Sequence, residues 1–365
     1  MTSDHRSPAV YWLFGLPFDA VDLPGAAGLL LEHARRGQRV IFATPNLNFL
    51  RTSRENPAFL AQVLHTDLSL VDGMPLVWLG RLAGVSFRER VAGSSLVEYL
   101  VQRPAAPGER LKTYLFGAEG DAAAAAMARL NEPATGLEAV GAMNPGHGSV
   151  EALSTPEIIA DINASGAQFL VVSLGAVKGH AWIEHNRDRL DPLIISHLGA
   201  VVNFLAGTVR RAPPLLQKLG LEWAWRVGQE PYLVRRYFRD GIFLIALLLR
   251  ALLPALLAAR RHAGGALELP AADTDGMRAI LRPRGALRAG TVETLAEAVR
   301  AATRAGARRV AIEMDGVEYV DSRGLGVLYE LRHRSGAEVE VRISGGNPRL
   351  QRQLRWHRAR CLWDD

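Results

Sequence analysis

Short apolar runs alternate with amphipathic stretches along the first 231 residues of this chain. Apolar runs that end at a polar residue or a glycine are typical of buried strands, and apolar residues spaced three or four apart predict helices. The predicted strands are 38–43, 68–71, 112–117, 137–141, 168–174 and 193–198, and the predicted helices are 24–35, 57–65, 75–83, 94–102, 121–130, 155–164 and 179–188. This alternation predicts an α/β domain with a Rossmann-like, mostly parallel sheet that helices cover on both faces.

Residues 232–262 have a different pattern, almost continuously apolar from Gly241 to Ala258 and flanked by arginines. The arginines are Arg235, Arg236 and Arg239 before the run, Arg250 within it, and Arg260 and Arg261 after it. A bilayer span needs about 20 apolar residues with few charges, and this run is slightly short and contains an arginine. The pattern therefore favours a basic helix in the membrane interface, with its arginines at anionic headgroups. A buried core or oligomer helix is the alternative.

A second, smaller α/β pattern follows Gly264-Gly265. It consists of two strands, a helix over 291–304, a strand over 308–314, a helix over 324–334, a strand over 338–343 and a helix over 347–355. The expected domains are therefore 1–231, 232–263 and 264–365, and the last of them is a compact α/β module.

Composition narrows the kinds of partner. The 365 residues are 48% hydrophobic and 22% charged, as in a soluble globular protein, and the formal net charge is +6. The positive charges are nearly all arginine, which pairs well with phosphate and carboxylate, so a phosphorylated substrate or anionic lipid is expected. The sequence lacks the pattern of basic and aromatic residues that would indicate a nucleic-acid partner.

The remaining features indicate a cytoplasmic protein without a metal site. The single cysteine, Cys361, excludes a disulfide framework and fits a reducing compartment. Residues 1–8 lack the charged-then-apolar order of a signal peptide. The histidines have no metal-ligand spacing, and Asp273-Thr274-Asp275 is interpreted as a linker or turn.

Two strand ends carry polar residues suited to chemistry. Strand 38–43 leads into Thr44-Pro45-Asn46, and strand 68–71 leads into Asp72-Gly73. Ligands of open α/β sheets bind at the carboxyl ends of the strands, so these residues are expected to share one crevice. Asp72 is a candidate general base. Each segment by itself is equally typical of a turn.

Other candidates are residues suited to holding an anion. Gly93-Ser94 precedes a helix whose amides can bind phosphate, and Arg90 can neutralise a diphosphate, although Ser94 is also suited to be an N-cap. Further candidates, each with a plain turn or loop as its alternative, are Gly117, His147, Gly175, Lys178, Asn203, Gly207 and Arg211.

Taken together, these segments resemble the WecG/TagA/CpsF family of bacterial glycosyltransferases. The ordered matches are Thr44-Pro45-Asn46, Asp72-Gly73, Glu89-Arg90-Val91-Ala92-Gly93-Ser94, Leu174-Gly175-Ala176 with Lys178, Trp182-Ile183, Asn186-Arg187, Phe204-Leu205-Ala206-Gly207-Thr208-Val209, Arg211-Ala212-Pro213, Gln217, Gly220-Leu221-Glu222-Trp223 and Gln229-Glu230-Pro231. They cover roughly residues 10–240.

The resemblance implies an inverting transferase that moves a sugar from a UDP-sugar to a polyprenyl-diphosphate-linked acceptor. The sugar would be N-acetylmannosamine, its uronic acid or a hexose, for a cell-surface or exported polysaccharide. It also implies Asp72 as the base, Thr44 and Asn46 in its pocket, Arg90 near the diphosphate, and no metal or other cofactor. Residues 232–262 would dock on the inner face of the cell membrane.

Two segments depart from the family's pattern. The family continues Gly-Ala with Pro-Lys-Gln-Glu, where this chain has Val177-Lys178-Gly179-His180, and Asn203 replaces the family's aspartate. These departures favour a rival interpretation, a non-catalytic scaffold that binds a nucleotide sugar and signals through its C-terminal domain.

Residues 266–361 resemble a STAS domain, through the segment Val317 to Leu328. Ser322 matches the phosphorylated serine of that family, and Arg323 replaces its usual second serine. The resemblance implies a docking surface for a protein partner. Phosphorylation would add about two negative charges at a helix start, and a helix N-cap is the alternative role of Ser322.

Overall fold

The computed structural model describes residues 8–105, 108–118, 120–209, 211–213, 215–216, 220–334 and 339–364. The chain forms two compact units. The large-sheet unit comprises Val21–Leu76 and Arg88–Arg239, and the C-terminal unit comprises the described residues up to Ala20, Val77–Phe87 and the chain from Asp240. These units divide the chain differently from the expected 1–231, 232–263 and 264–365, because two segments near the N-terminus join the C-terminal unit.

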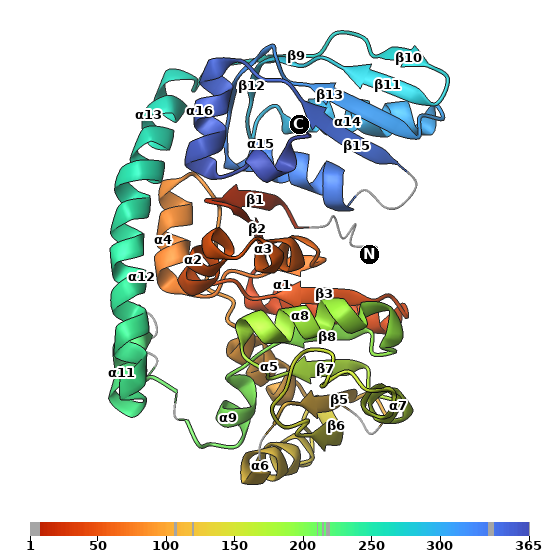
Figure 1. Cartoon of the computed structure of the whole chain (residues 1–365), viewed down its shortest axis with the longest axis vertical. Helices are drawn as coiled ribbons and strands as arrows, with labels where there is room; N and C mark the ends of the chain where they lie inside the picture. Colours follow the sequence, from red (N-terminus) through yellow and green to blue (C-terminus); the bar gives the residue numbers. More distant parts are fainter. Residues whose placement is uncertain are drawn as a thin grey trace. The chain divides into compact units, whose positions relative to one another are not determined.

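The large-sheet unit contains a parallel sheet of six strands, in the order β4-β3-β8-β7-β5-β6 (Figure 1). The strands are β3 (Val40–Ala43), β4 (Leu68–Ser69), β5 (Leu111–Phe116), β6 (Leu137–Met143), β7 (Phe169–Val172) and β8 (Ile194–His197). Every strand predicted in this part of the chain is present. The predicted parallel α/β architecture is confirmed.

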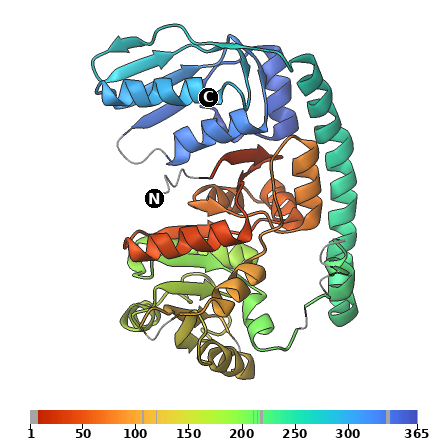
Figure 2. The same ribbon diagram turned by 180° about the vertical axis from the view of Figure 1, so that it is seen from behind.

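Helices cover both faces of this sheet because alternate strand residues point to opposite sides. Phe42 packs with helices α1, α5 and α6 on one side, and Ile41 packs with α7 and α8 on the other. Figure 1 shows α8 in front of the sheet, and Figure 2 shows α1 on the reverse side. The predicted helices are observed as α1 (Leu23–Arg35), α3 (Pro57–Leu64), α4 (Met74–Leu82), α5 (Gly93–Gln102), α6 (Gly120–Leu130), α7 (Pro156–Ala164) and α8 (Ala176–Asn186).

Three of the helices that the structure describes in this unit, α2, α9 and α11 (Glu222–Gln229), were not predicted. Helix α2 (Leu47–Glu55) begins directly after Asn46, whose Oδ1 accepts a hydrogen bond from the amide of Phe49 at 3.2 Å. The asparagine that suggested a turn is therefore a helix cap. Helix α9 covers Val201–Leu205; 3₁₀ turns lie at Arg187–Arg189 and Pro231–Leu233.

A 28-residue helical segment, Val234–Arg261, contains the apolar run. It consists of α12 (Val234–Leu247), a π-helical turn (Leu248–Leu252) and α13 (Leu253–Arg261), and α11 (Glu222–Gln229) precedes it. Pro254 lacks an amide hydrogen, which interrupts the regular α-helical ladder next to the π-helical turn. By length and composition alone this segment is long and apolar enough to cross a membrane, so the run is not too short for a span.

The C-terminal unit contains two sheets. One has the order β10-β11-β13-β15 and the other β14-β12-β9. The strands are β9 (Leu267–Glu268), β10 (Asp273–Asp275), β11 (Arg278–Leu281), β12 (Arg284–Leu287), β13 (Arg309–Glu313), β14 (Val317–Val320) and β15 (Glu340–Ser344). Its helices are α14 (Val292–Arg304), α15 (Ser322–Tyr329) with a π-helical turn (Glu330–Arg334), α16 (Pro348–His357) and a 3₁₀ turn (Arg360–Leu362).

This part of the fold corrects two interpretations of the sequence. Asp273-Thr274-Asp275 is a strand, paired antiparallel with β11, and not a linker or turn. Residues 10–19, for which no element was predicted, form a hairpin of β1 (Val10–Leu13) and β2 (Leu16–Asp19). Its turn places Phe14 at φ 53° and Gly15 at φ 117°, which suits a tight two-residue connection.

Two buried histidines lie side by side in the large-sheet unit. His180 on α8 and His197 at the end of β8 have ring centroids 5.6 Å apart. A Cβ at Gly179 would lie 2.2 Å from Cδ2 of His197, so glycine leaves room for that ring. Burial lowers the pKa of His180 to about 3 and that of His197 to about 4. Both rings are therefore neutral at pH 7.

These histidines predict acid sensitivity. Between about pH 4 and 6.5 the unfolded chain protonates both rings while the folded chain does not, so the free energy of unfolding falls as pH falls. Each histidine contributes about 1.4 kcal/mol per pH unit. His180→Phe, whose ring fits between Phe49 and Phe59, is expected to remove one such contribution in urea unfolding at pH 7 to 4.5. The exposed His147→Phe is the control; equal slopes for wild type and His180→Phe would contradict the prediction.

Candidate functional site

The two strand ends singled out in the sequence lie together. The amide of Leu70 donates to the carbonyl of Ala43 at 2.8 Å, and the amide of Asp72 donates to the carbonyl of Pro45 at 3.0 Å. These bonds continue the pairing of β3 and β4 beyond the strands. They place Thr44 and Asp72 at the same carboxyl edge of the sheet, where α/β proteins bind ligands.

The segment around Arg90 joins this edge. The amide of Val91 donates to the carbonyl of Val71 at 2.8 Å, next to Asp72. A Cβ at Gly93 would lie 3.5 Å from Oγ1 of Thr44, so the start of α5 lies directly on Thr44. Helix α5 has no side-chain cap, and its N-terminal amides are suited to an anion.

The structure decides the capping roles suggested for two of the candidates, Asn46 and Ser94. Oδ1 of Asn46 caps α2, so this residue has a structural role, as the turn alternative also implied. Ser94 is not an N-cap, because α5 begins at Gly93 and its cap position is Ala92. The hydroxyl of Ser94 is therefore not committed to capping.

Charged residues from α11 and α12 surround Asp72. Arg90 forms an ion pair with Glu222, and both side chains are largely buried. The pKa of Asp72 is raised to about 6, mainly by burial; Glu222 adds to this rise, while Arg90, Arg226 and Arg236 oppose it. A carboxylate with a raised pKa beside arginines has the electrostatics of a catalytic base near an anionic ligand.

Sequence reasoning missed Glu222, Arg226 and Arg236 as members of this site. Glu222 stood in a recognised motif, Gly220 to Trp223, but nothing in the spacing showed which cation it would meet. Arg226 was unremarked and Arg236 was assigned to the membrane helix, since their effect on Asp72 depends on how α11 and α12 fold back.

A second pair of loops follows β5 and β7. Gly117 has a φ of 87°, and a Cβ there would lie 2.9 Å from the carbonyl oxygen of Ser173. Gly175, with a φ of 75°, is the N-cap position of α8, which therefore has no side-chain cap. Lys178 does not extend freely toward a phosphate, because its Nζ donates to the carbonyl of Gly148 at 2.9 Å. His147 is exposed in the neighbouring loop.

The candidates after β8 surround Phe204. Arg211 lies 5.5 Å and Arg226 6.0 Å from the centre of its ring, and burial lowers the pKa of Arg211. Gly207 ends α9 with a φ of 73°, while the side chain of Asn203 is exposed. Arg210 and Gln217 lie outside the described residues.

In the C-terminal unit, Ser322 is buried and its Oγ donates to the carbonyl of Trp12 at 2.8 Å. The N-cap of α15 is Asp321, whose Oδ1 accepts from the amide of Gly324 at 2.7 Å. The N-cap alternative for Ser322 is therefore wrong.

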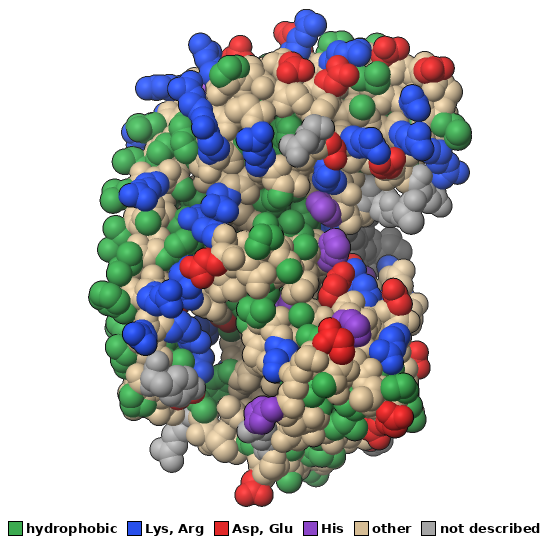
Figure 3. Space-filling model, in the orientation of Figure 1, with side chains coloured by type: hydrophobic (Ala, Val, Ile, Leu, Met, Phe, Trp, Pro, Cys, Tyr) green, Lys and Arg blue, Asp and Glu red, His purple; other side chains and the backbone are tan. Residues whose placement is uncertain are grey.

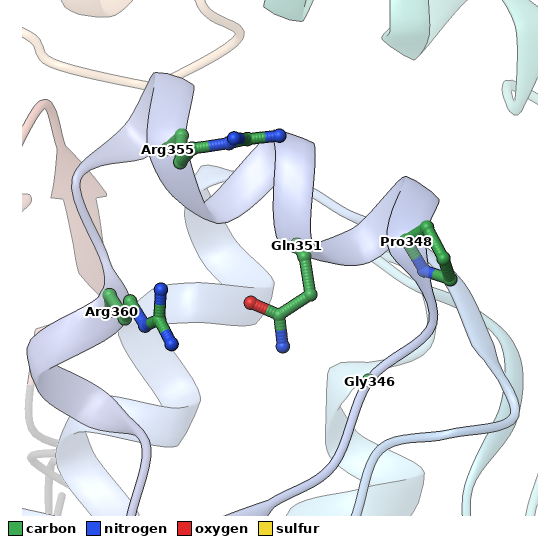
Figure 4. Close-up of a pocket in the computed structure, with 5 residues that line it drawn as sticks. All are labelled: Gly346, Pro348, Gln351, Arg355 and Arg360. Carbon is green, nitrogen blue, oxygen red and sulfur yellow. The ribbon is translucent and has the colours of Figure 1, made fainter. Parts of the chain in front are cut away.

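A cavity of 410 Å³ also lies in the C-terminal unit, lined by Gly346, Pro348, Gln351, Arg355 and Arg360. Figure 4 shows Gln351 and Arg360 facing one another across it. It contains none of the residues singled out in the sequence. Among the described residues, no three histidine, cysteine, aspartate or glutamate side chains gather as a metal site.

Comparison with known proteins accounts for both units. Residues 268–359 match the STAS domain model. One solved structure, the murine solute carrier 26 family member A9 anion transporter in the inward-facing state, is 14% identical with a TM-score of 0.17. The match covers 52% of this chain and about a third, 34%, of the transporter, and so low a score supports no argument.

The model of the glycosyl transferase WecG/TagA/CpsF family matches residues 11–256, well over half of the chain. That range includes both strand ends, the Arg90 segment and α11 with Glu222. This chain belongs to the WecG/TagA/CpsF family of glycosyl transferases and carries a C-terminal STAS domain.

Proposed function

We propose that the chain is an inverting transferase that moves a sugar from a UDP-sugar to a polyprenyl-diphosphate-linked acceptor, in the synthesis of a cell-surface or exported polysaccharide. The observation that carries the proposal is the constellation at the carboxyl edge of the sheet, where Asp72, Thr44, Arg90 and the uncapped start of α5 meet.

Asp72 is the proposed base. The acceptor hydroxyl must lose a proton as it attacks the anomeric carbon, and a carboxylate with a pKa of about 6 is ionised at pH 7 yet basic enough to take that proton. Thr44 lies beside it and is suited to orient a substrate hydroxyl. Attack from the side opposite the leaving group inverts the anomeric centre.

The departing UDP gains negative charge, which cationic side chains and helix amides offset without a metal in this proposal. The amides at the start of α5 and the guanidinium of Arg90 lie nearest to Asp72 and Thr44. Arg90 already forms an ion pair with Glu222, so a bound diphosphate would compete with Glu222 for Arg90. Arg211, next to Phe204, is a further candidate.

The altered loop supports a rival proposal, a scaffold that binds a nucleotide sugar without transferring it. Gly179 and His180 occupy positions where the family resemblance leads one to expect glutamine and glutamate. His180 is buried against Phe49 and Phe59, and Lys178 is bound to a loop carbonyl. Only a turnover assay separates the two proposals.

The first test is a panel of UDP-sugars with a short polyprenyl-diphosphate-sugar acceptor, followed by UDP release. Wild type is expected to release UDP with one donor, and Asp72→Asn to lose about 10²- to 10⁴-fold in kcat, as loss of a general base does. Donor binding, measured by calorimetry, is expected to remain in Asp72→Asn. Binding by wild type without UDP release from any donor would favour the scaffold.

A second test uses the pH dependence of transfer. The base works when ionised, so kcat is expected to fall as pH falls through about 6, to about a tenth of its plateau at pH 5. Glu222→Gln should move this limb to lower pH, and Arg90→Gln to higher pH, because the two charges act on the Asp72 pKa in opposite directions. Shifts of the same sign in both variants would argue against Asp72 as the titrating group.

We also propose that helix Val234–Arg261 binds the inner face of the cell membrane without crossing it. Its exposed apolar residues recur at helical spacing: Phe238, Ile242, Ile245, Leu249, Leu253 and Leu257. Figure 3 shows hydrophobic side chains with lysine and arginine among them along the edge formed by α12 and α13. Leu247, Ala251 and Leu252 are buried, and the π-helical turn and α13 pack on α16, so lipid cannot surround the helix in this arrangement.

The membrane proposal predicts co-sedimentation with vesicles of phosphatidylcholine and phosphatidylglycerol. Replacing Ile245 and Leu249 together by glutamate is expected to weaken partitioning about a hundredfold, since two exposed apolar side chains no longer enter the interface. Met277→Glu, at an equally exposed methionine outside the helix, is the matched control. Retention of the double variant on vesicles would refute the proposal.

A further inference from the structure

The hairpin β1–β2 packs on α15 of the STAS domain. Oγ of Ser322 donates to the carbonyl of Trp12 at 2.8 Å, and Arg323 donates to the carbonyl of Val10 at 2.8 Å. In return, Nε1 of Trp12 donates to the carbonyl of His357 at 2.9 Å. The first two bonds use backbone carbonyls of β1, so they depend on the position of the strand and not only on the identity of its side chains.

A buried ion pair closes the other strand of the hairpin. Asp19, 1% exposed, accepts two hydrogen bonds from Arg334 at 2.8 and 3.1 Å. Trp12, fully buried, lies 5.9 Å from the ring of Tyr329. If the hairpin left while Arg334 stayed buried, the arginine would carry an uncompensated charge. The ion pair therefore stabilises the docked hairpin.

Two residues of α15 are suited to this occupant. A Cβ at Gly326 would lie 2.0 Å from the carbonyl oxygen of Val10, so only glycine lets the backbone of β1 come this close. Arg323, which departs from the family's serine, reaches Val10 and lies 6.0 Å from the ring of Tyr11.

The hairpin also holds the segment Val77–Phe87. Phe18 meets Phe87 edge to face with centroids 6.1 Å apart, and the hydroxyls of Tyr11 and Ser86 are 3.2 Å apart. This segment starts five residues after Asp72 and ends three residues before Arg90. The chain that connects these two charged residues is thus part of the C-terminal unit.

We propose that α15 of the STAS domain is a docking surface whose resident ligand is this chain's own hairpin, Val10–Asp19, and that release of the hairpin loosens the connection between Asp72 and Arg90. The surface therefore accepts a β-hairpin in cis, and any protein partner of α15 must displace it. The consequence for activity rests on the proposed function, whereas the docking does not.

The burial of Ser322 makes its modification and the docked hairpin mutually exclusive. A phosphate on Oγ removes the donor to Trp12 and places about two negative charges against a carbonyl oxygen. The phosphorylated state is therefore the state with the hairpin released. Phosphorylation of Ser322 would release the hairpin, and this release is the proposed means by which the STAS domain acts on the transferase site.

The test is hydrogen exchange followed by mass spectrometry on the full chain. Gly326→Ala is expected to speed exchange about tenfold or more in residues 10–19 and 77–87 and in the segments around Asp72 and Arg90, while β11, β13 and β15 stay protected. Gly324→Ala is the matched control in the same helix, because its Cβ would meet the carbonyl oxygen of Leu287 at 2.5 Å, within the STAS domain itself. Its effect is expected around β12.

Ser322 supplies an independent pair of variants. Ser322→Asp is expected to reproduce the exchange pattern of Gly326→Ala, and Ser322→Ala, which loses one hydrogen bond, to resemble wild type. Where wild type turns over, the released variants should lose kcat.

Three results would overturn the inference. Protection of residues 10–19 in Gly326→Ala would exclude hairpin docking as described. Loss of their protection only together with the whole C-terminal sheet would show that the hairpin is not a separable ligand. Release of the hairpin without change near Asp72 and Arg90 would exclude the coupling. Exchange decides these points even if wild type transfers no sugar.

Discussion

Desolvation of the Asp72 carboxylate is the constraint on which the rest of the site depends. A half-buried carboxylate is costly to ionise unless cations lie nearby, and Arg90, Arg226 and Arg236 supply them. Arg90 also forms an ion pair with Glu222, so it offsets the charge of Asp72 only in part. The pKa of Asp72 therefore remains raised. The backbone bonds between the ends of β3 and β4 hold this carboxylate beside Thr44 and the start of α5.

Side-chain packing accounts for the departures from the family pattern. Gly179 has no side chain because the ring of His197 occupies that space, and His180 packs against two phenylalanines. The altered loop is thus a repacked interior at the start of α8, in which a glycine and one neutral imidazole stand where the family resemblance leads one to expect polar side chains. Arg323 is a departure of a second kind, since it donates to a backbone carbonyl of the N-terminal hairpin.

The STAS domain is more than a module appended after the transferase. Its unit includes the hairpin from the beginning of the chain and the segment Val77–Phe87 between two charged site residues. The glycosyl transferase match begins at residue 11, inside that hairpin, so the boundary between the two families in sequence is not the boundary between the two compact units. The segment Val77–Phe87 is continuous in the chain with Asp72 and Arg90, and it meets the hairpin through Ser86 and Phe87.

The sequence by itself determined the elements of the large sheet, the apolar helix and the pairing of two strand ends, because hydrophobic periodicity and turn chemistry are local properties. It placed Thr44, Asn46 and Asp72 in one crevice, since carboxyl ends of parallel strands share one edge, and it singled out Arg90 and Gly93 separately as an anion-binding helix start. Tertiary structure alone decided that Glu222 pairs with Arg90 and that β1–β2 packs on α15. Those contacts join residues more than a hundred positions apart, and their partners are selected by burial and geometry, which leave no local pattern along the chain.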